Sequence, residues 1–172
     1  MGIKSSDVVG LRTFHAYNFI HNKSIFVGAG KDTPWPGTPE VVPEPTYNGT
    51  IENLVALKRA DQVRYALPDP AGDIEITTGQ KYRLVSEEEA IANNSRWVYV
   101  QAWFKYDQFP VTTYRQTGVF VNVKLRTGVP VNKDVALPDD VESYGFFVNL
   151  SNLDPVVRDK HSRESIEYII EL

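Results

Sequence analysis

Residues 97–105, WVYVQAWFK, place their side chains alternately on two faces, as a β-strand does. Trp97, Tyr99 and Trp103 fall on one face, and four apolar side chains fall on the other. Because apolar groups occupy both faces, we expect a central strand that is covered on both sides.

Further segments rich in β-branched and aromatic residues flank this strand, and proline and glycine turns separate them. They predict strands at 24–29, 63–67, 81–85, 116–125, 144–150 and 165–170. Gly28 and Gly30 are expected to end the first of these strands. The pattern predicts a mainly β fold, a β-sandwich-like domain with a few short peripheral helices, with an α+β fold as the alternative.

The N-terminal segment 7–22 is predicted to be a helix. Apolar residues recur in it at helical spacing: Val8, Leu11, Phe14 and Tyr17. Three side chains before or at its start can cap a helix: Ser5, Ser6 and Asp7. This spacing places the four apolar side chains on one face of the helix.

Two more helices are predicted further along the chain. The first covers residues 50–58, with Asn48 or Thr50 as its cap. Its apolar face is formed by Ile51, Leu54, Val55 and Leu57. The second begins at Ser86, where the acidic run 87–89 lies at the positive end of the helix dipole.

A proline-rich loop is predicted at 34–45. Five prolines prevent a helix or a central strand there: Pro34, Pro36, Pro39, Pro43 and Pro45. The loop also contains Trp35, whose indole is costly to leave in water. Trp35 is therefore pinned either to its own domain or to a partner protein, and the sequence leaves both alternatives open.

Composition bounds the class of protein. The 172 residues suffice for one domain or two small ones, and we expect a single structural domain over residues 1–172. There are no cysteines, which excludes disulfides and cysteine-ligated zinc. The net charge of −4 argues against nucleic-acid binding. No apolar run is long enough to cross a membrane.

Motifs of catalysis and cofactor binding are weak. The segment 28–33, GAGKDT, resembles a phosphate-binding loop, but Ile25 stands where the first glycine should be and Asp32 where a hydroxyl should be. His15, His21 and His161 lack the spacing of metal ligands. The aspartates of segment 69–73 could in principle bind calcium, but the segment has the composition of a turn. We therefore expect no catalytic residue, no cofactor and no metal site. A convergent pair of carboxylates would leave no local signature and stays an alternative.

Three stretches in order resemble the baseplate wedge subunit family of contractile-tailed, T-even-like phages, of which this chain looks like a shortened member. The stretches are residues 17–35, including the Gly30–Trp35 turn GKDTPW; the proline loop through VRYALP at 63–68; and 109–122 with 161–169. The resemblance implies a mainly β fold, no catalysis and several protein partners.

The resemblance implies a structural subunit that bridges neighbouring proteins of a baseplate wedge in a multi-subunit symmetric assembly. It places the chain in the virion, and in the host cytoplasm during assembly, without nucleic-acid or membrane partners. Because a stiff loop loses little entropy on docking and a tryptophan is a strong anchor, partner-binding residues are predicted in the loop. They are Lys31, Pro34, Trp35, Pro36, Pro39 and Pro43.

An alternative function is a carbohydrate-binding or host-recognition module of a tail. Its basis is the group of aromatic residues on and next to the 97–105 strand: Trp97, Tyr99, Trp103 and Tyr106. Such residues can stack on sugars, although they more often belong to a core.

Overall fold

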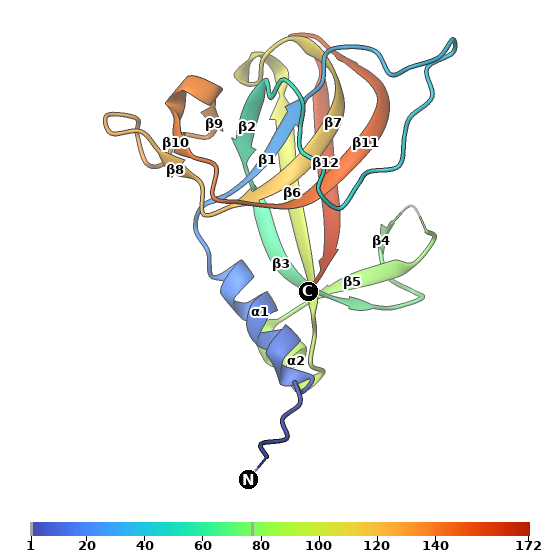
Figure 1. The fold of residues 1–172 in the computed structure, drawn as a ribbon, viewed down its shortest axis with the longest axis vertical. Coiled ribbons are helices and arrows are strands. Elements are labelled where there is room, and N and C mark those ends of the chain that lie inside the picture. Colours follow the sequence, from blue (N-terminus) through green and yellow to red (C-terminus); the bar gives the residue numbers. More distant parts are fainter. Residues whose placement is uncertain (1, 77) are drawn as a thin grey trace. The chain divides into compact units, whose positions relative to one another are not determined.

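The computed structural model describes residues 2–76 and 78–172 (Figure 1). Strands dominate these residues, and only two short α-helices accompany them. The mainly β, sandwich-like class predicted from the sequence is therefore confirmed.

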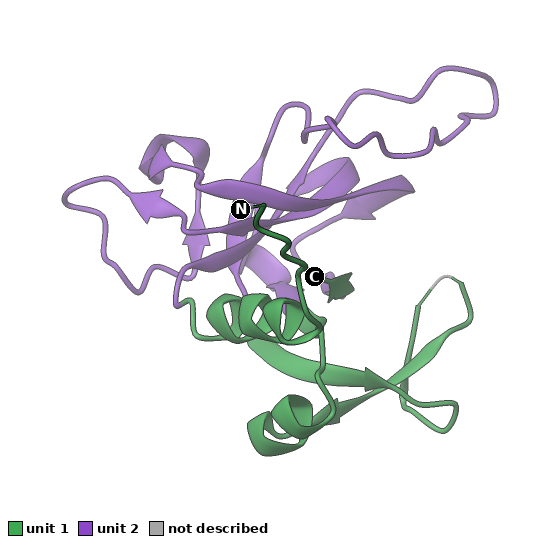
Figure 2. Ribbon diagram, turned by 60° about the horizontal axis from the view of Figure 1, so that its bottom comes forward, with its two compact units in different colours: residues 1–22, 62–100, 167–172 green, residues 23–61, 101–166 purple. Residues whose placement is uncertain are grey.

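The chain divides into two compact units whose segments alternate along the sequence (Figure 2). Unit 1 comprises Met1–Asn22, Gln62–Val100 and Glu167–Leu172. Unit 2 comprises Lys23–Asp61 and Gln101–Ile166. A single structural domain over the whole chain stays a prediction.

Five strands of unit 2 form one sheet in the order β11-β7-β1-β2-β9. They are β1 (Ile25–Gly30), β2 (Ala56–Arg59), β7 (Thr112–Val121), β9 (Val135–Ala136) and β11 (Phe146–Arg158). All pairings in it are antiparallel, and β1 pairs with β7 and β2 on its two sides. A small second sheet pairs β8 (Lys124–Leu125) with β10 (Val141–Ser143). Single 3-10 turns lie at η1 (Tyr106–Gln108) and η2 (Pro138–Asp140).

The other five-stranded sheet has the order β12-β6-β3-β5-β4. Its strands are β3 (Gln62–Pro68), β4 (Ile74–Glu75), β5 (Lys81–Val85), β6 (Trp97–Lys105) and β12 (Arg163–Glu171). The central strand predicted at 97–105 is confirmed, because β6 has these bounds and lies between two neighbours.

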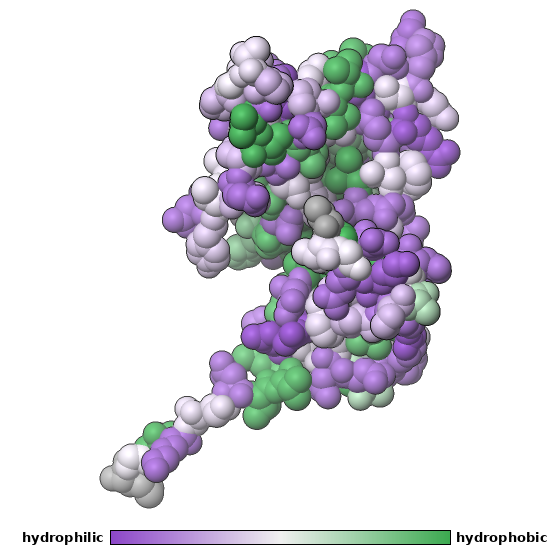
Figure 3. All heavy atoms as spheres, turned by 90° about the vertical axis from the view of Figure 1, so that its right-hand side faces the viewer, coloured by the Kyte–Doolittle hydropathy of each residue, from purple (hydrophilic) through white to green (hydrophobic). Residues whose placement is uncertain are grey.

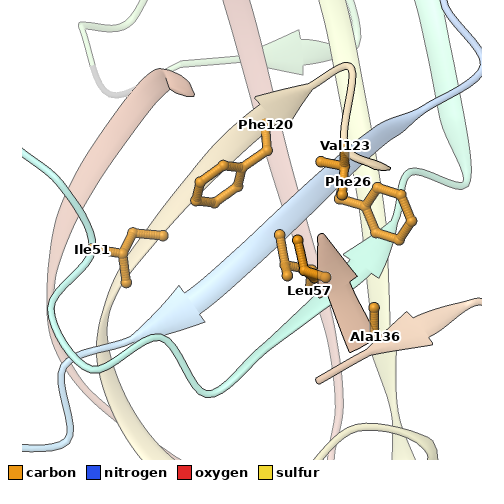
Figure 4. Packing of buried hydrophobic residues seen from close by; sticks show 7 residues of the cluster. Phe26, Ile51, Leu57, Phe120, Val123 and Ala136 are labelled. Carbon is orange, nitrogen blue, oxygen red and sulfur yellow. The ribbon is translucent and has the colours of Figure 1, made fainter. Parts of the chain in front are cut away.

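The core of unit 2 lies on β1, β2 and β7 (Figure 4). Its buried side chains are Phe26, Ile51, Leu57, Phe120, Val123, Ala136 and Val141. Two glycines of β1 lie within this packing. Gly30 is the last residue of the strand, as predicted, whereas Gly28 lies inside it and does not end it. A Cβ at Gly28 would meet Phe120 at 2.8 Å, and one at Gly30 would meet the Glu52 carbonyl oxygen at 2.7 Å. The glycines are there because neighbouring groups fill the space of a side chain.

The helix predicted at 50–58 is wrong. Residues 51–55 have no helix, and Asn53 has a φ of +46°. The following residues form β2, which pairs with β1 over 56–59. Ile51 and Leu57 are still buried in one cluster, so the apolar pattern marks the core while the long-range strand pairing decides the backbone.

The N-terminal helix exists, but it starts later than predicted, and the apolar face marked by the spacing is not the buried one. Helix α1 spans Gly10–Ile20, and its N-cap residue Val9 makes no side-chain capping bond. The buried residues of α1 are Thr13, Ala16 and Phe19. Both sides of the helix carry apolar residues, and the small side chains of Thr13 and Ala16 allow closer packing against the unit than bulky Leu11 and Phe14 would.

Helix α2 (Glu87–Ala92) confirms the third predicted helix. The Ser86 hydroxyl accepts the Glu89 amide at 3.2 Å, as expected of a cap. The strand predicted at 116–125 is interrupted, because Asn122 has a φ of +62° and the chain resumes as β8. The strand predicted at 144–150 is β11, which is longer and continues to Arg158.

Candidate functional site

The segment between β1 and β2, residues 31–55, has no helix or strand and contains the predicted proline loop (Figure 1). We call it the β1–β2 loop. Of the residues predicted to bind a partner, Pro34, Pro36, Pro39 and Pro43 are exposed. Lys31 and Trp35 are buried instead.

Trp35 is pinned to unit 2 itself. Its side chain is only 6% exposed, and its Nε1 donates a hydrogen bond to the carbonyl oxygen of Leu153 on β11 at 2.8 Å. The Nζ of Lys31 lies 4.5 Å from the centroid of the Trp35 ring and 2.6 Å from a carboxylate oxygen of Glu52. Of the two alternatives for Trp35, the structure selects packing against its own unit.

A bidentate ion pair holds the loop to β7. Arg115 donates from Nε and Nη2 to the two carboxylate oxygens of Glu40 at 2.7 and 2.8 Å. Its Nη1 donates to the Asp32 carbonyl oxygen at 2.8 Å, and the Trp35 amide donates to Glu40 at 2.9 Å. The Arg115 hydrogen bond, with that of the Trp35 amide, lowers the pKa of Glu40 below its ordinary value of 4.5.

Because its folded-state pKa is lowered, Glu40 stabilises the fold above about pH 4.5. That contribution is lost as the pH falls through the lower, folded-state pKa. We expect Glu40→Gln to destabilise the protein clearly at pH 7 and much less at pH 3, as measured by urea unfolding at both pH values. The matched control is Glu44→Gln, at an exposed position of the same loop. An equal loss for Glu40→Gln at both pH values would contradict this role of the ion pair.

A relay of side-chain amides fixes the loop further along. The Asn152 side chain donates to the Pro43 carbonyl oxygen at 2.9 Å and accepts from Gln116 at 3.0 Å. The Gln116 side-chain oxygen accepts the Glu52 amide at 2.8 Å. The loop is thus attached to β7 and β11 at several points along its length.

Beyond these attachments the loop exposes apolar groups. Val41 is 66% exposed, and Tyr47 is as exposed as in an extended chain. A groove of about 560 Å³ runs between 45–49 of the loop and 147–150 of β11. The attached loop therefore presents a shaped, partly apolar surface to solvent.

A second exposed apolar surface lies on α1 and on the two residues before it, in unit 1. It consists of Val8, Val9, Leu11, Phe14 and Tyr17, whose side chains are exposed. Figure 3 shows apolar residues, in green, at the surface where the N-terminal segment leaves unit 1. Large apolar side chains that gather on one helix are a common mark of a protein interface.

The remaining residues singled out in the sequence form no common site. Tyr99 is buried, Trp103 lies under the guanidinium of Arg163 at 4.2 Å, and Tyr106 is exposed. His21 forms a 2.7 Å ion pair with Glu87. Within the described ranges 2–76 and 78–172, no group of three or more histidine, cysteine, aspartate or glutamate residues could hold a metal ion. No helix in the same ranges is long and apolar enough to cross a membrane.

Comparison with known proteins gives two matches. A family model described as "Baseplate wedge 3 tail fiber network component" matches residues 6–172. The chain is also 27% identical over 135 residues to "Virion protein 3" of Enterococcus phage phiEF24C, and the alignment covers 73% of each chain. The family match includes segments of both units.

Proposed function

The chain belongs to the baseplate wedge 3 tail fiber network component family, and on that basis we propose that it bridges neighbouring proteins of a phage tail baseplate wedge. The family resemblance drawn from the sequence is confirmed, and with it a structural role in a phage tail. The bridging role, its partners and its residues are our proposal.

A bridging subunit needs at least two docking surfaces, and two candidates are present. The single observation that carries the proposal is the β1–β2 loop, which is attached through Trp35, Glu40 and Asn152 and yet exposes Val41 and Tyr47. An attached loop has already lost most of its conformational entropy, so docking costs less. The exposed face of α1 supplies the second surface.

In this proposal the partners are other wedge proteins of the same virion, arranged in a symmetric assembly, and neither nucleic acid nor membrane takes part. The chain acts without catalysis, and it is present in the host cytoplasm until it joins the virion. The family description supports a structural component, and the exposed surfaces suit protein contacts. Among residues 2–76 and 78–172, no specific arrangement of side chains favours the carbohydrate-binding alternative.

Two paired variants test the bridging role. Val41→Ser with Tyr47→Ser alters the loop, and Leu11→Ser with Phe14→Ser alters α1. Each pair is expected to weaken binding to one neighbouring wedge protein by about 2 kcal/mol, roughly 30-fold, while binding to the other neighbour stays unchanged. Pairwise calorimetry with purified neighbours measures both affinities.

The matched control is Val157→Ser, because Val157 is 76% exposed on β11 and belongs to neither surface. It should leave both affinities unchanged. All four altered side chains are exposed, so thermal unfolding should stay close to that of the unaltered chain. If neither pair of substitutions weakens binding to any wedge protein, the bridging proposal is wrong.

A further inference from the structure

A second groove of unit 2, with a volume of about 520 Å³, lies where residues 23–24, 123–131 and the side chains of Arg59 and Glu142 meet. Its charge differs from that of the whole chain. Four cationic residues line it, namely Lys23, Arg59, Lys124 and Arg126, and a single acidic residue, Glu142, is found among them. The groove is thus positively charged in a chain with a net charge of −4.

The one acidic residue is already paired. Glu142 lies 2.6 Å from the Nζ of Lys124, so these two charges offset each other. Lys23, Arg59 and Arg126 form no ion pair among the residues that the structure describes. Within the described part of the chain, three positive charges of the groove therefore form no salt bridge, although the Asp134 carboxylate acts on Arg59 electrostatically.

Arg59 is the fixed member of the three. Its guanidinium donates to the carbonyl oxygens of Lys23 at 3.0 Å, Val131 at 2.7 Å and Lys133 at 3.3 Å, and it lies 4.5 Å from the centroid of the Phe26 ring. A guanidinium has five N–H groups, and these carbonyls use three of them. Partial burial lowers the pKa of Arg59, while the charge of the Asp134 carboxylate opposes this shift without forming an ion pair.

Apolar side chains complete the lining. Val131 is 88% exposed, whereas Val123 is buried, and Leu125 and Val129 are half-buried. A ligand that fits this lining combines anionic groups with apolar ones. A nucleic acid fits it less well, because a polyanion needs a basic stripe along its length and would be repelled by the acidic remainder of the chain.

We propose that this groove binds an acidic segment of a partner protein, with carboxylates on Lys23, Arg59 and Arg126 and apolar side chains against Val129 and Val131. Carboxylates match a guanidinium in geometry and charge, and the preset position of Arg59 favours a two-pronged contact. The site shares no residue with the apolar surfaces of the β1–β2 loop and α1, and it does not depend on their role.

A labelled peptide that alternates glutamate and leucine over eight residues is a suitable probe. Fluorescence anisotropy with the full chain should show saturable binding that weakens as salt is raised. Lys23→Ala with Arg126→Ala should reduce the affinity about tenfold, since two exposed ion pairs with the peptide are lost. Both altered residues are exposed, so the fold should remain intact.

Three controls make the test specific. The peptide with glutamine in place of glutamate should not bind, and Lys160→Ala, at an exposed lysine outside the groove, should not change the affinity. Duplex DNA should bind more weakly than the acidic peptide at the same salt concentration. The proposal is overturned if the acidic peptide fails to bind, if the double substitution leaves its affinity unchanged, or if DNA binds as tightly.

Discussion

Replacing Trp35 by alanine is expected to lower the free energy of unfolding by about 3–5 kcal/mol. The side chain is 6% exposed, and its Nε1 hydrogen bond to Leu153 joins the β1–β2 loop to β11. Alanine would leave a cavity and an unpaired carbonyl oxygen at the same place. Urea unfolding, followed by tryptophan fluorescence and circular dichroism, measures the loss.

Two substitutions separate packing from hydrogen bonding and from general effects on the loop. Trp35→Phe keeps much of the volume and loses the Nε1 donor, so its cost should be smaller than that of alanine, although still measurable. Tyr47→Ala removes a fully exposed aromatic residue of the same loop and should change stability by less than about 0.5 kcal/mol. A loss of under about 1 kcal/mol for Trp35→Ala would show that the indole is not part of the core.

This result would redefine the role of Trp35 in docking. The sequence offers Trp35 as an anchor in a partner, but a buried indole that bonds to its own unit cannot serve as one without leaving its place. In the proposed docking, Trp35 would position the loop, and the exposed residues Val41 and Tyr47 would make the contacts. The two experiments separate these roles. Val41→Ser with Tyr47→Ser should weaken partner binding without lowering stability, whereas Trp35→Ala should lower the free energy of unfolding.

Local patterns predicted the elements that are determined locally. The alternation in 97–105 gives β6 with its bounds, and the Ser86 cap with three acidic residues gives α2. The helix prediction for 50–58 failed because the helical spacing of its apolar residues competes with strand pairing to a distant part of the chain. Strand β1 needs a neighbour on each side, and 56–59 supplies one of them.

The error on α1 has a different cause. Periodicity detects an apolar face but does not say which of two such faces turns inward. In α1 the face with Thr13, Ala16 and Phe19 is buried, and the face with Leu11 and Phe14 is exposed. The sequence alone therefore does not identify the exposed face as a candidate docking surface, because the structure is needed to show which face is buried.

Buried cations are the least predictable part of this chain. Lys58, Arg115 and Arg158 are at most 6% exposed, although their sequence neighbours are ordinary polar or strand residues. Each has partners that lie elsewhere in the unit, such as Asp134 for Lys58 and Glu40 for Arg115, although the Nε of Arg158 makes no hydrogen bond among the described residues. Without the fold, such residues look like a solvated surface.

Arg158→Met is expected to destabilise the protein by about 3 kcal/mol or more. Arg158 is 1% exposed, its Nη1 donates to the carbonyl oxygen of Phe104 at 3.0 Å and of Ser162 at 3.3 Å, and its Nη2 donates to that of Tyr106. Methionine keeps the length and the apolar stem but removes every donor. Hydrogen bonds from a charged donor contribute about 1.5–3 kcal/mol each, and the losses are not fully additive. Urea unfolding at pH 7 measures the difference.

An apolar residue in place of a buried charge is sometimes harmless, so the reason why it is costly here matters. Such a replacement is harmless only when the charged residue and the group that pairs with it are both replaced by apolar groups. The hydrogen-bond acceptors of Arg158 are backbone carbonyls, which stay polar whatever side chain replaces the guanidinium. The Glu164 carboxylate, 3.8 Å from its Nη1, would also lose its cation. Arg158→Lys should be intermediate, because an ammonium keeps the charge but cannot reach all three carbonyls in the fork geometry. Arg126→Met, at an exposed position, should be nearly neutral. If Arg158→Met is as stable as Arg126→Met, the end of β11 does not depend on this arginine for its attachment.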